Sequence, residues 1–280
     1  MEKWKKLEFF YAKRLRECNA HERKMLYFEA YSVVSKLGAK EFSSDNPEKR
    51  TAGTSKELVQ LLSHMVDKEQ RVLEIGCGRG YTCLKLAPYI KSMVGIEVSE
   101  SAIIESKKLL SKNKIKNVEI RRTSATELKN NFNNNEFDSC ISIELIEHLH
   151  PEDAKEHLKQ VFLVLKPGGK YIINMPNRLS GPHDITKEEF PDEKEALGFH
   201  LNESTYEEMI NIMKSIGFYR FKAFYPLKLS KKGVRPLIAP CQLGIACEIF
   251  YKNIPNLFRH SLLEKLIPIN IVAYKPLTGQ

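Results

Sequence analysis

The side chains best suited to chemistry follow a short apolar run at residues 138–143. Glu144, Glu147 and His148 stand at positions i, i+3 and i+4, a spacing that places three side chains on one face of a helical turn. Two carboxylates and an imidazole suit a divalent cation. We predict that a fourth ligand, His200, comes from later in the chain. The same residues also fit a metal-free site in which His148 acts as a general base.

A glycine-rich loop, in the sequence RVLEIGCGRGYT, separates a predicted buried strand from a helix that begins near Tyr81. Gly76, Gly78 and Gly80 let the chain turn sharply and bring backbone N–H groups close to a ligand. A dinucleotide fingerprint needs a third glycine at position 81, and a Walker loop needs Gly-Lys-Ser/Thr, so the sequence excludes both. Glu97 lies 21 residues after Gly76, at the end of the next strand. A carboxylate there accepts hydrogen bonds from both ribose hydroxyls. The loop and Glu97 together predict a nucleoside-containing ligand without a pyrophosphate.

This E-x-G-x-G-x-G loop with its acidic strand end resembles motif I and the following motif of class I S-adenosylmethionine-dependent methyltransferases, over about Thr54–Phe224. The resemblance implies a three-layer, Rossmann-like α/β fold with seven strands, the last antiparallel, and S-adenosyl-L-methionine at the carboxyl ends of the first strands. It assigns the cofactor to Glu74, Gly76, Cys77, Gly78 and Gly80 at the methionine end, Glu97 and Val98 at the ribose, and Ser124 and Ala125 at the adenine. The family usually carries an acidic residue where Ser124 stands.

The E-x-x-E-H run and the later segment FHLNESTYEEM resemble the small-RNA 2′-O-methyltransferases, and a related run occurs in ubiquinone-biosynthesis O-methyltransferases. In the first family this cluster and a later histidine bind one metal. The resemblance therefore implies that Glu144, Glu147, His148 and His200 hold Mg²⁺ or Mn²⁺. Both families methylate a hydroxyl that has a hydroxyl neighbour. A divalent ion chelated by such a diol lowers the pKa of the attacking hydroxyl.

A further candidate base or ligand, His183, lies in the segment NMPNRLSGPHDI after the fifth predicted strand. The predicted catalytic residues are therefore His148, Glu147 and His183. Asn177 and Asp184 of the same segment are candidates for orienting a polar substrate, although Asn, Gly and Pro are also common in ordinary turns.

The charge of the chain is unevenly distributed. The 280 residues are 42% hydrophobic and 28% charged, as in soluble globular proteins, and the net charge is +9. That charge divides into +4 for residues 1–50, −4 for 51–213 and +9 for 214–280. Nucleic acid, an anionic membrane surface and an acidic substrate are all compatible with the basic C-terminal part. The slightly acidic middle favours a small or lipid-linked hydroxyl substrate over RNA.

We predict four segments: a helical N-terminal extension at 1–50, a methyltransferase core at 51–226, a basic helical insertion or lid at 227–268, and a last strand with its tail at 269–280. The predicted strands are 71–75, 93–98, 118–121, 138–143, 171–174, 220–224 and 269–274. Six cysteines without a C-x-x-C pair, no signal-peptide pattern and no membrane-span pattern predict a cytoplasmic protein. Peripheral membrane contact is compatible with these features.

The function predicted from these features is S-adenosylmethionine-dependent O-methylation of a small or lipid-linked molecule, assisted by a divalent metal. Three alternatives are open: an RNA 2′-O-methyltransferase, a metal-independent small-molecule methyltransferase with His148 as the base, and a binding protein that retains the fold without catalysis. The complete glycine loop and the run of Glu144, Glu147 and His148 argue against the last of these.

Overall fold

A computed structural model describes residues 2–41, 55–228, 234–254 and 267–277. The helices are α1 (Lys3–Glu17), α2 (Ala20–Glu41), α3 (Lys56–Ser63), α4 (Tyr81–Leu86), α5 (Glu100–Lys112), α6 (Leu128–Asn131), α7 (Pro151–Val164), α8 (Thr186–Glu189), α9 (Tyr206–Ile216) and α10 (Cys241–Asn253), with short 3₁₀ turns η2 (Ala87–Tyr89), η3 (Ile146–His148) and η4 (Arg178–Ser180). The strands are β1 (Arg71–Ile75), β2 (Ser92–Glu97), β3 (Val118–Arg122), β4 (Phe137–Ile143), β5 (Leu165–Met175), β6 (Tyr219–Lys228), β7 (Val234–Pro240) and β8 (Ile269–Tyr274).

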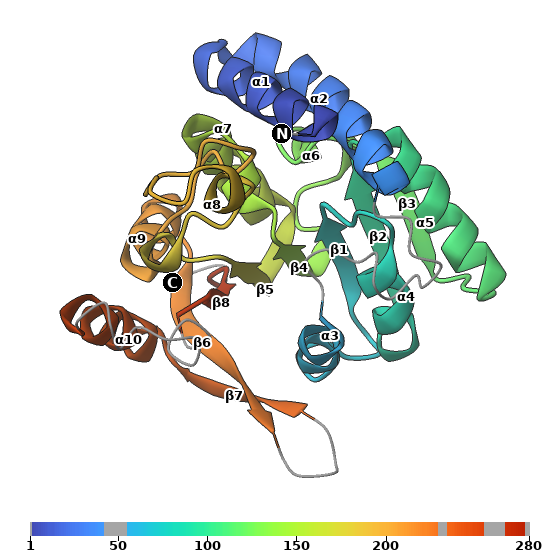
Figure 1. The fold of residues 1–280 in the computed structure, drawn as a ribbon. Helices are drawn as coiled ribbons and strands as arrows, with labels where there is room; N and C mark the ends of the chain where they lie inside the picture. Colours follow the sequence, from blue (N-terminus) through green and yellow to red (C-terminus); the bar gives the residue numbers. More distant parts are fainter. Residues whose placement is uncertain (1, 42–54, 229–233, 255–266, 278–280) are drawn as a thin grey trace.

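All eight strands belong to one sheet, in the order β3-β2-β1-β4-β5-β8-β6-β7 (Figure 1). Strands β1 to β5 pair in parallel, whereas β8 is antiparallel to both β5 and β6. The predicted α/β sheet with an antiparallel last strand is confirmed, but the prediction of seven strands was wrong. The additional strand, β7, pairs with β6 as a hairpin at the edge of the sheet. Its sequence VRPLIAP contains two prolines, which an edge strand tolerates because no further strand needs their missing N–H groups.

The prediction that segment 227–268 is a helical insertion was wrong in part, because the segment includes strand β7. It contains the end of β6, all of β7 and helix α10, while its stretches 229–233 and 255–266 lie outside the described residues. The hairpin and α10 project from the rest of the molecule (Figure 1). The N-terminal extension forms two helices, α1 and α2, with a short break at Cys18 and Asn19.

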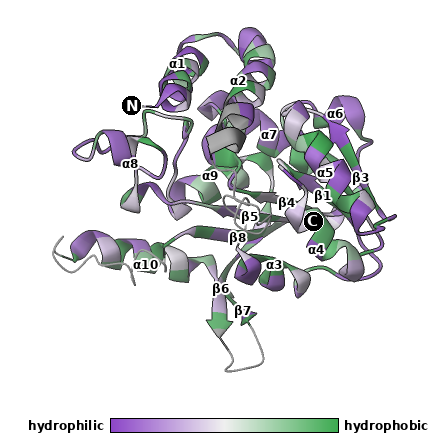
Figure 2. Cartoon of the chain, turned by 45° about the vertical axis from the view of Figure 1, so that its right-hand side comes forward, coloured by the Kyte–Doolittle hydropathy of each residue, from purple (hydrophilic) through white to green (hydrophobic). Residues whose placement is uncertain are grey.

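Helices cover both faces of the sheet and enclose two apolar cores. Side chains of α3, α4 and α5 pack on one face, around Val72, Met93 and Ile141 of the strands. On the other face lie α6, α7 and α9 together with the N-terminal helices. The strands and the inward sides of the helices are hydrophobic, whereas the outward sides of the helices are hydrophilic (Figure 2). Burial of these apolar faces from water is the main force that holds the three layers together.

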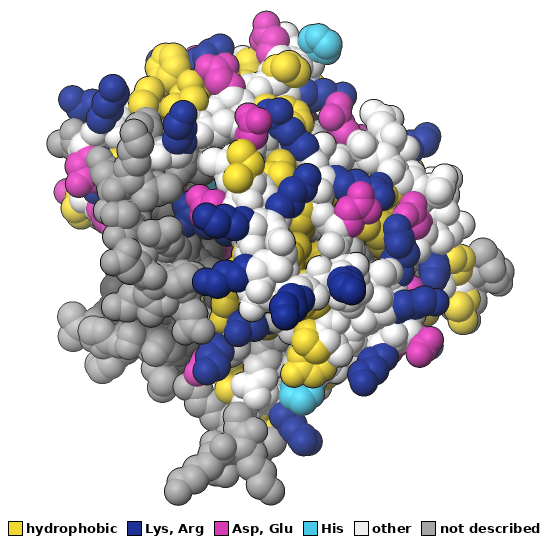
Figure 3. All heavy atoms as spheres, turned by 90° about the vertical axis from the view of Figure 1, so that its right-hand side faces the viewer, with side chains coloured by type: hydrophobic (Ala, Val, Ile, Leu, Met, Phe, Trp, Pro, Cys, Tyr) yellow, Lys and Arg dark blue, Asp and Glu magenta, His cyan; other side chains and the backbone are white. Residues whose placement is uncertain are grey.

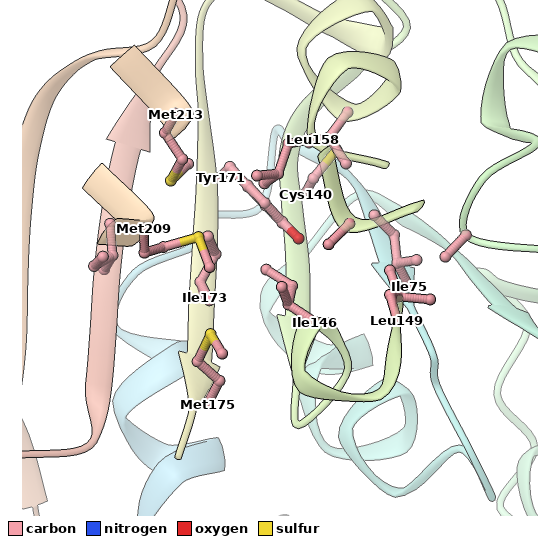
Figure 4. Packing of buried hydrophobic residues seen from close by; sticks show 14 of the residues in the cluster. Ile75, Cys140, Ile146, Leu149, Leu158, Tyr171, Ile173, Met175, Met209 and Met213 are labelled. Atoms are coloured by element: carbon pink, nitrogen blue, oxygen red, sulfur yellow. The ribbon is translucent and has the colours of Figure 1, made fainter. Parts of the chain in front are cut away.

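The second core also supports the turn after β4. Met209 and Met213 of α9 pack toward β5 (Figure 4), and Ile146 and Leu149 lie in the same cluster near Ile75 of β1. Ile146 is 1% exposed and Leu149 5%. Because these two residues flank Glu147 and His148, their burial fixes the position of that turn.

Helix α2 is attached to α7 by buried polar contacts. Arg23, which is 2% exposed, donates to Asp153 at 2.8 Å and to Glu152 at 2.6 Å. The hydroxyl of Tyr27 donates to the same Asp153 carboxylate at 2.9 Å and accepts from the N–H of His150. The N-terminal extension is thereby held over the carboxyl ends of the strands.

One face of the core domain is basic despite the net charge of −4 for residues 51–213. Lys and Arg side chains predominate on the face formed by α5, β3 and their neighbours (Figure 3). Five exposed lysines lie in α5 and the turn after it: Lys107, Lys108, Lys112, Lys114 and Lys116. The segment sums thus conceal a local positive surface, on which Lys and Arg outnumber the Asp and Glu that also lie there (Figure 3).

Candidate functional site

A pocket opens at the carboxyl ends of β1, β2 and β4, beneath α2. Its lining residues are Tyr27, Tyr31, Gly76, Ile96, Glu97, Val98, Thr123, Ser124, Ala125, Glu144, Leu145, His148 and Leu149. Ligands in open α/β sheets bind at this edge, where the strand order reverses between β1 and β4. The pocket therefore brings predicted cofactor residues together with His148, one of the predicted metal ligands.

The glycine loop between β1 and α4 depends on glycine at each of its three positions. Gly76, Gly78 and Gly80 all have positive φ, between +50° and +76°. A Cβ on Gly76 would approach Leu145 to 2.9 Å, and one on Gly80 would approach Ser106 to 2.8 Å. A Cβ on Gly78 would meet nothing within 4 Å, so this residue borders open space. The loop therefore turns tightly at both ends and leaves room at its middle.

Glu97 ends β2 at the wall of the pocket. Its carboxylate accepts from the N–H groups of Gly78, Val98 and Ser99 at 3.0, 2.8 and 2.9 Å. Burial raises the pKa of Glu97, and these three N–H donors oppose the rise. The hydrogen bonds fix the carboxylate against the glycine loop, and its role toward the ribose stays a prediction.

The remaining predicted cofactor residues divide between the pocket and the core. Ser124 and Ala125 line the pocket, whereas Glu74 is 3% exposed and accepts a hydrogen bond from the Cys83 thiol at 2.9 Å. Burial raises the pKa of Glu74 to about 7. Cys77 is buried beside this pair. Glu74 thus supports the glycine loop from beneath, and its role toward the methionine end of the cofactor remains a prediction.

Glu144 follows β4 in an unusual backbone conformation. Its φ is +47°, which residues other than glycine adopt rarely, and its N–H donates to the carbonyl of Asn174 on β5 at 2.8 Å. The chain then enters the 3₁₀ turn η3 instead of the regular helical turn that the spacing predicts. For this reason Glu144, Glu147 and His148 do not all converge. Glu144 lines the pocket, and burial raises its pKa.

Three of the four predicted metal ligands do converge. One ligand atom each from Glu147, His148 and His200 lie within 4.8 Å of one another, and Glu144 is outside this cluster. We call these three residues the Glu/His cluster. Glu147 is completely buried, and neither of its carboxylate oxygens has a hydrogen-bond partner. Burying an unpartnered carboxyl group is unfavourable, so this site calls for a cation or a proton.

The two histidines of the cluster are held through their Nδ1 atoms. Nδ1 of His148 lies 3.2 Å from the carbonyl oxygen of Phe199, and Nδ1 of His200 lies 2.7 Å from Glu203. A proton on each Nδ1 would donate to these acceptors and leave Nε2 as the free ligand atom. Metal-binding histidines are commonly oriented in this way.

The charges within the cluster follow from burial and from these partners. Burial raises the pKa of Glu147 to about 8 and lowers that of His148 to about 3. Burial also lowers the pKa of His200, but the hydrogen bond to Glu203 and the charge of Glu147 outweigh it, so the pKa of His200 is raised. At Glu203 burial raises the pKa, but the hydrogen bond from His200 outweighs this effect, so the pKa of Glu203 is lowered. His148 is thus neutral, as a metal ligand must be.

The residues predicted in the segment after β5 are placed apart from the pocket. Nε2 of His183 lies 3.0 Å from the Ser180 hydroxyl and 3.1 Å from the carbonyl of Asn177, and the ring does not line the pocket. Asn177 is buried and donates to Glu248 of α10. Asp184 accepts from the N–H of His200 at 3.3 Å and so contributes to placing that residue.

Four residues of the N-terminal helices contact the site and were not predicted from the sequence. Tyr31 stacks on Phe199 at 4.8 Å and meets the edge of His148 at 5.9 Å, and Tyr27 lines the pocket beside it. Arg16 of α1 donates to carbonyls of the segment 196–200, including that of His200 at 3.2 Å. Glu8 accepts from the N–H of Phe199 at 3.3 Å. The tyrosines' i, i+4 spacing marks one helix face, but nothing in the sequence shows what that face covers.

Comparison with known proteins agrees with this geometry. A family model described as a methyltransferase domain matches residues 66–231. The chain belongs to this methyltransferase family. The predicted class I methyltransferase is thereby confirmed, together with the fold that it implies.

No helix of the described residues is long and apolar enough to span a membrane.

Individual relatives are distant. A probable S-adenosylmethionine-dependent methyltransferase of Mycolicibacterium smegmatis is 26% identical over 148 residues, which is 52% of this chain and 51% of that protein. A ubiquinone biosynthesis O-methyltransferase of Bradyrhizobium diazoefficiens is 31% identical over 108 residues, 39% of this chain and 40% of that protein. The chain thus spans about half the length, or less, of these curated relatives. Among solved structures, the 1,6-didemethyltoxoflavin N1-methyltransferase of Burkholderia thailandensis, with S-adenosylhomocysteine bound, has a TM-score of 0.57 at 15% identity, covering 92% of this chain and 91% of that one. This likeness shows the fold.

Proposed function

We propose that this chain transfers a methyl group from S-adenosyl-L-methionine to a hydroxyl of a small or lipid-linked molecule. The observation that carries the proposal is the single pocket shared by Gly76, Glu97 and His148. A cofactor held by the loop and by Glu97 has its reactive methyl near the Glu/His cluster, where an acceptor hydroxyl would also lie. The likeness to ubiquinone biosynthesis O-methyltransferases supports oxygen as the acceptor atom.

We further propose that Glu147, His148 and His200 hold a divalent ion such as Mg²⁺ or Mn²⁺. The residues fit: two imidazole rings and one carboxyl group converge, each histidine is oriented by a second group, and the Glu147 oxygens have no other partner. When bound, such an ion supplies Lewis acidity that makes an acceptor hydroxyl easier to deprotonate.

The residues of the chain itself position the reactants. Glu97 would hold the ribose, and the glycine loop would hold the methionine part of the cofactor. Tyr27 and Tyr31 of α2 cover the pocket and would exclude water from the transferring methyl. Transfer from the sulfonium carbon then depends mainly on alignment of the acceptor oxygen with that carbon.

A metal-free mechanism with His148 as the base is less well supported. A pKa of about 3 makes His148 a poor proton acceptor near neutral pH. The same neutral state suits a metal ligand. The metal-assisted proposal also accounts for the unpartnered carboxyl group of Glu147.

An RNA 2′-hydroxyl is a second candidate acceptor, favoured by one observation. The exposed lysines of α5 and the turn after it give the core domain a basic face, on which an RNA backbone could lie (Figure 3). Methylation of short RNAs that exceeds methylation of catechol-type diols would favour this acceptor over the small-molecule one.

The first test is calorimetry of the folded protein with S-adenosylhomocysteine, where we expect binding that Glu97→Ala weakens. Transfer of radiolabelled methyl to a catechol-type diol is then measured with chelator and after restoring Mg²⁺ or Mn²⁺. We expect activity only with the metal. Absence of S-adenosylhomocysteine binding would contradict the methyltransferase proposal and favour a binding protein without catalysis. Turnover that chelator does not affect would contradict the metal proposal alone.

A further inference from the structure

Large apolar side chains are exposed in the projecting C-terminal part of the chain. Six of the thirteen exposed large hydrophobic residues of the described chain fall between positions 227 and 250. This group, called here the C-terminal apolar surface, is spread over the β6–β7 hairpin and α10. It consists of Leu227, Leu237, Ile238, Leu243, Ile249 and Phe250, each 43–60% exposed. Leu237 and Ile238 are consecutive in β7 and therefore point to the two faces of the hairpin. Single exposed hydrophobic residues are ordinary, but a concentration of them marks an interaction surface.

Helix α10 is apolar on two opposite sides. Its inward side packs on the domain, and a Cβ on Gly244 would come within 2.8 Å of the Tyr206 ring. The opposite side exposes Leu243 and Phe250, which are seven residues apart and therefore lie on one stripe of the helix. A helix at the surface of a soluble domain normally carries polar residues there. The outward side of α10 is thus suited to a second apolar environment.

Cations outnumber carboxylates around this surface, although the first turn of α9 carries Glu207 and Glu208. Exposed cations on α9, β6, β7 and α10 border it, namely Lys214, Arg220, Lys222, Arg235 and Lys252. The only carboxylate in the described part of residues 214–277 is Glu248. It is 3% exposed and accepts hydrogen bonds from the Asn177 side chain and from the Tyr206 N–H, both at 2.6 Å. Glu248 thus lies beneath the surface, where its charge acts on Lys252 of the same helix.

A hollow between α9, β6 and α10 brings two of these cations together. It is lined by Lys214 and Arg220 with Phe221, Ile245 and other residues, and no carboxylate takes part. Arg220 occupies the irregular pairing between β6 and β8 with a φ of +49°. Two cations above an apolar wall match a phosphate that is attached to a hydrocarbon chain.

We propose that the C-terminal apolar surface docks the protein onto an anionic phospholipid membrane. The apolar side chains would enter the boundary between headgroups and acyl chains, and the flanking cations would contact lipid phosphates. The β6–β7 hairpin and α10 extend away from the sheet layers in both ribbon views, so they can reach a flat surface before the rest of the molecule (Figures 1 and 2). This docking goes beyond methyl transfer and does not depend on it.

The test is co-sedimentation of the full chain with vesicles of phosphatidylcholine alone or with about a quarter phosphatidylglycerol. We expect binding to the mixed vesicles that weakens as salt is added, and little binding to phosphatidylcholine alone. The double variant Leu243→Ser/Phe250→Ser should lower the partition coefficient by about tenfold or more, because two apolar side chains no longer enter the lipid. Ile104→Ser on α5, where the side chain is 61% exposed, is the matched control and should bind normally.

Three outcomes would overturn the docking proposal. The first is that the chain binds anionic and neutral vesicles equally. The second is that the double variant binds as tightly as the Ile104→Ser control. The third is that the native chain forms a dimer that the double variant abolishes, while neither protein binds vesicles. The last outcome would assign the surface to a second copy of the chain. Calorimetry with S-adenosylhomocysteine and a thermal melt on each variant separate these outcomes from misfolding. Vesicle binding without S-adenosylhomocysteine binding would leave docking intact and contradict only the proposed methyl transfer.

Discussion

Replacing Glu147 by glutamine keeps the size of the side chain and removes the one carboxylate from the Glu/His cluster. A metal that binds only the folded protein stabilises it by RT ln(1 + [M]/Kd). With about 1 mM Mn²⁺ and a Kd of about 10 μM, this stabilisation is about 2.7 kcal/mol. Unfolding entropy scales with chain length, so for 280 residues the melting temperature should rise by about 5 °C.

Loss of the Glu147 carboxylate should weaken metal binding by about 100-fold or more. At the same Mn²⁺ concentration the stabilisation of Glu147→Gln then falls to about 0.4 kcal/mol, a rise of less than about 1 °C. Glu144→Gln is the control, because Glu144 belongs to the same turn and lines the pocket but lies outside the cluster. We expect this variant to keep most of the native response.

Thermal melts of the native chain and both variants, each with chelator and with Mn²⁺, measure these shifts. Equal responses from Glu147→Gln and the native chain would refute the ligand assignment. Loss of the response in Glu144→Gln but not in Glu147→Gln would show that the metal lies on the cofactor side of the turn. No response in the native chain would show that the buried Glu147 is protonated and is not a ligand.

Other expectations concern the cofactor site and the fold. Glu97→Ala should weaken S-adenosylhomocysteine binding by about 30-fold, since hydrogen bonds accepted by a charged group are worth about 2 kcal/mol; unchanged affinity in calorimetry would count against ribose binding by Glu97. Burial lowers the pKa of His157 to about 4, so the unfolded chain takes up the proton first and stability should fall by up to about 3 kcal/mol as pH decreases from about 6.5 to 4. Urea unfolding at several pH values checks this, and His157→Gln should flatten the dependence. Arg23→Ala leaves the buried Asp153 without its cation and should cost about 3 kcal/mol, whereas Lys13→Ala removes only an exposed ion pair and should cost less than about 0.5 kcal/mol. Equal losses of urea stability in the two variants would contradict the importance of the α2–α7 contact.

The elements and the cofactor loop were predictable because their signals are local. β1 and β8 have the predicted limits, and β2, β3 and β4 differ from prediction by one residue at one or both ends. Short apolar runs between glycine turns and amphipathic segments are typical of buried parallel strands. The spacing of the glycines and Glu97 likewise reflects the length of one strand, one helix and the next strand. β7 was missed because its prolines oppose strand formation except at an edge, and edge position is a property of the whole sheet.

The candidate metal site shows the limit of local signals. The spacing of Glu144, Glu147 and His148 suggested three ligands from one helical turn, but the positive φ of Glu144 directs the chain into a 3₁₀ turn. That conformation depends on the pairing of Glu144 with Asn174 of β5. The fourth predicted ligand, His200, did reach the cluster, held by groups from α1 and the segment after β5.

Sequence by itself determined seven of the eight strands, the glycine loop, the spaced acid and the residue types of the cluster, since each is encoded within a few tens of residues. Only the tertiary structure decided which of those residues meet. Contacts such as Arg16 with the segment 196–200 and Tyr31 with His148 join positions more than 100 residues apart. The tertiary structure also decided where charged and apolar side chains gather on the surface. Residues 51–213 sum to −4 yet carry a basic face, and the basic C-terminal part pairs its cations with exposed apolar side chains, because folding sorts charges by position in space.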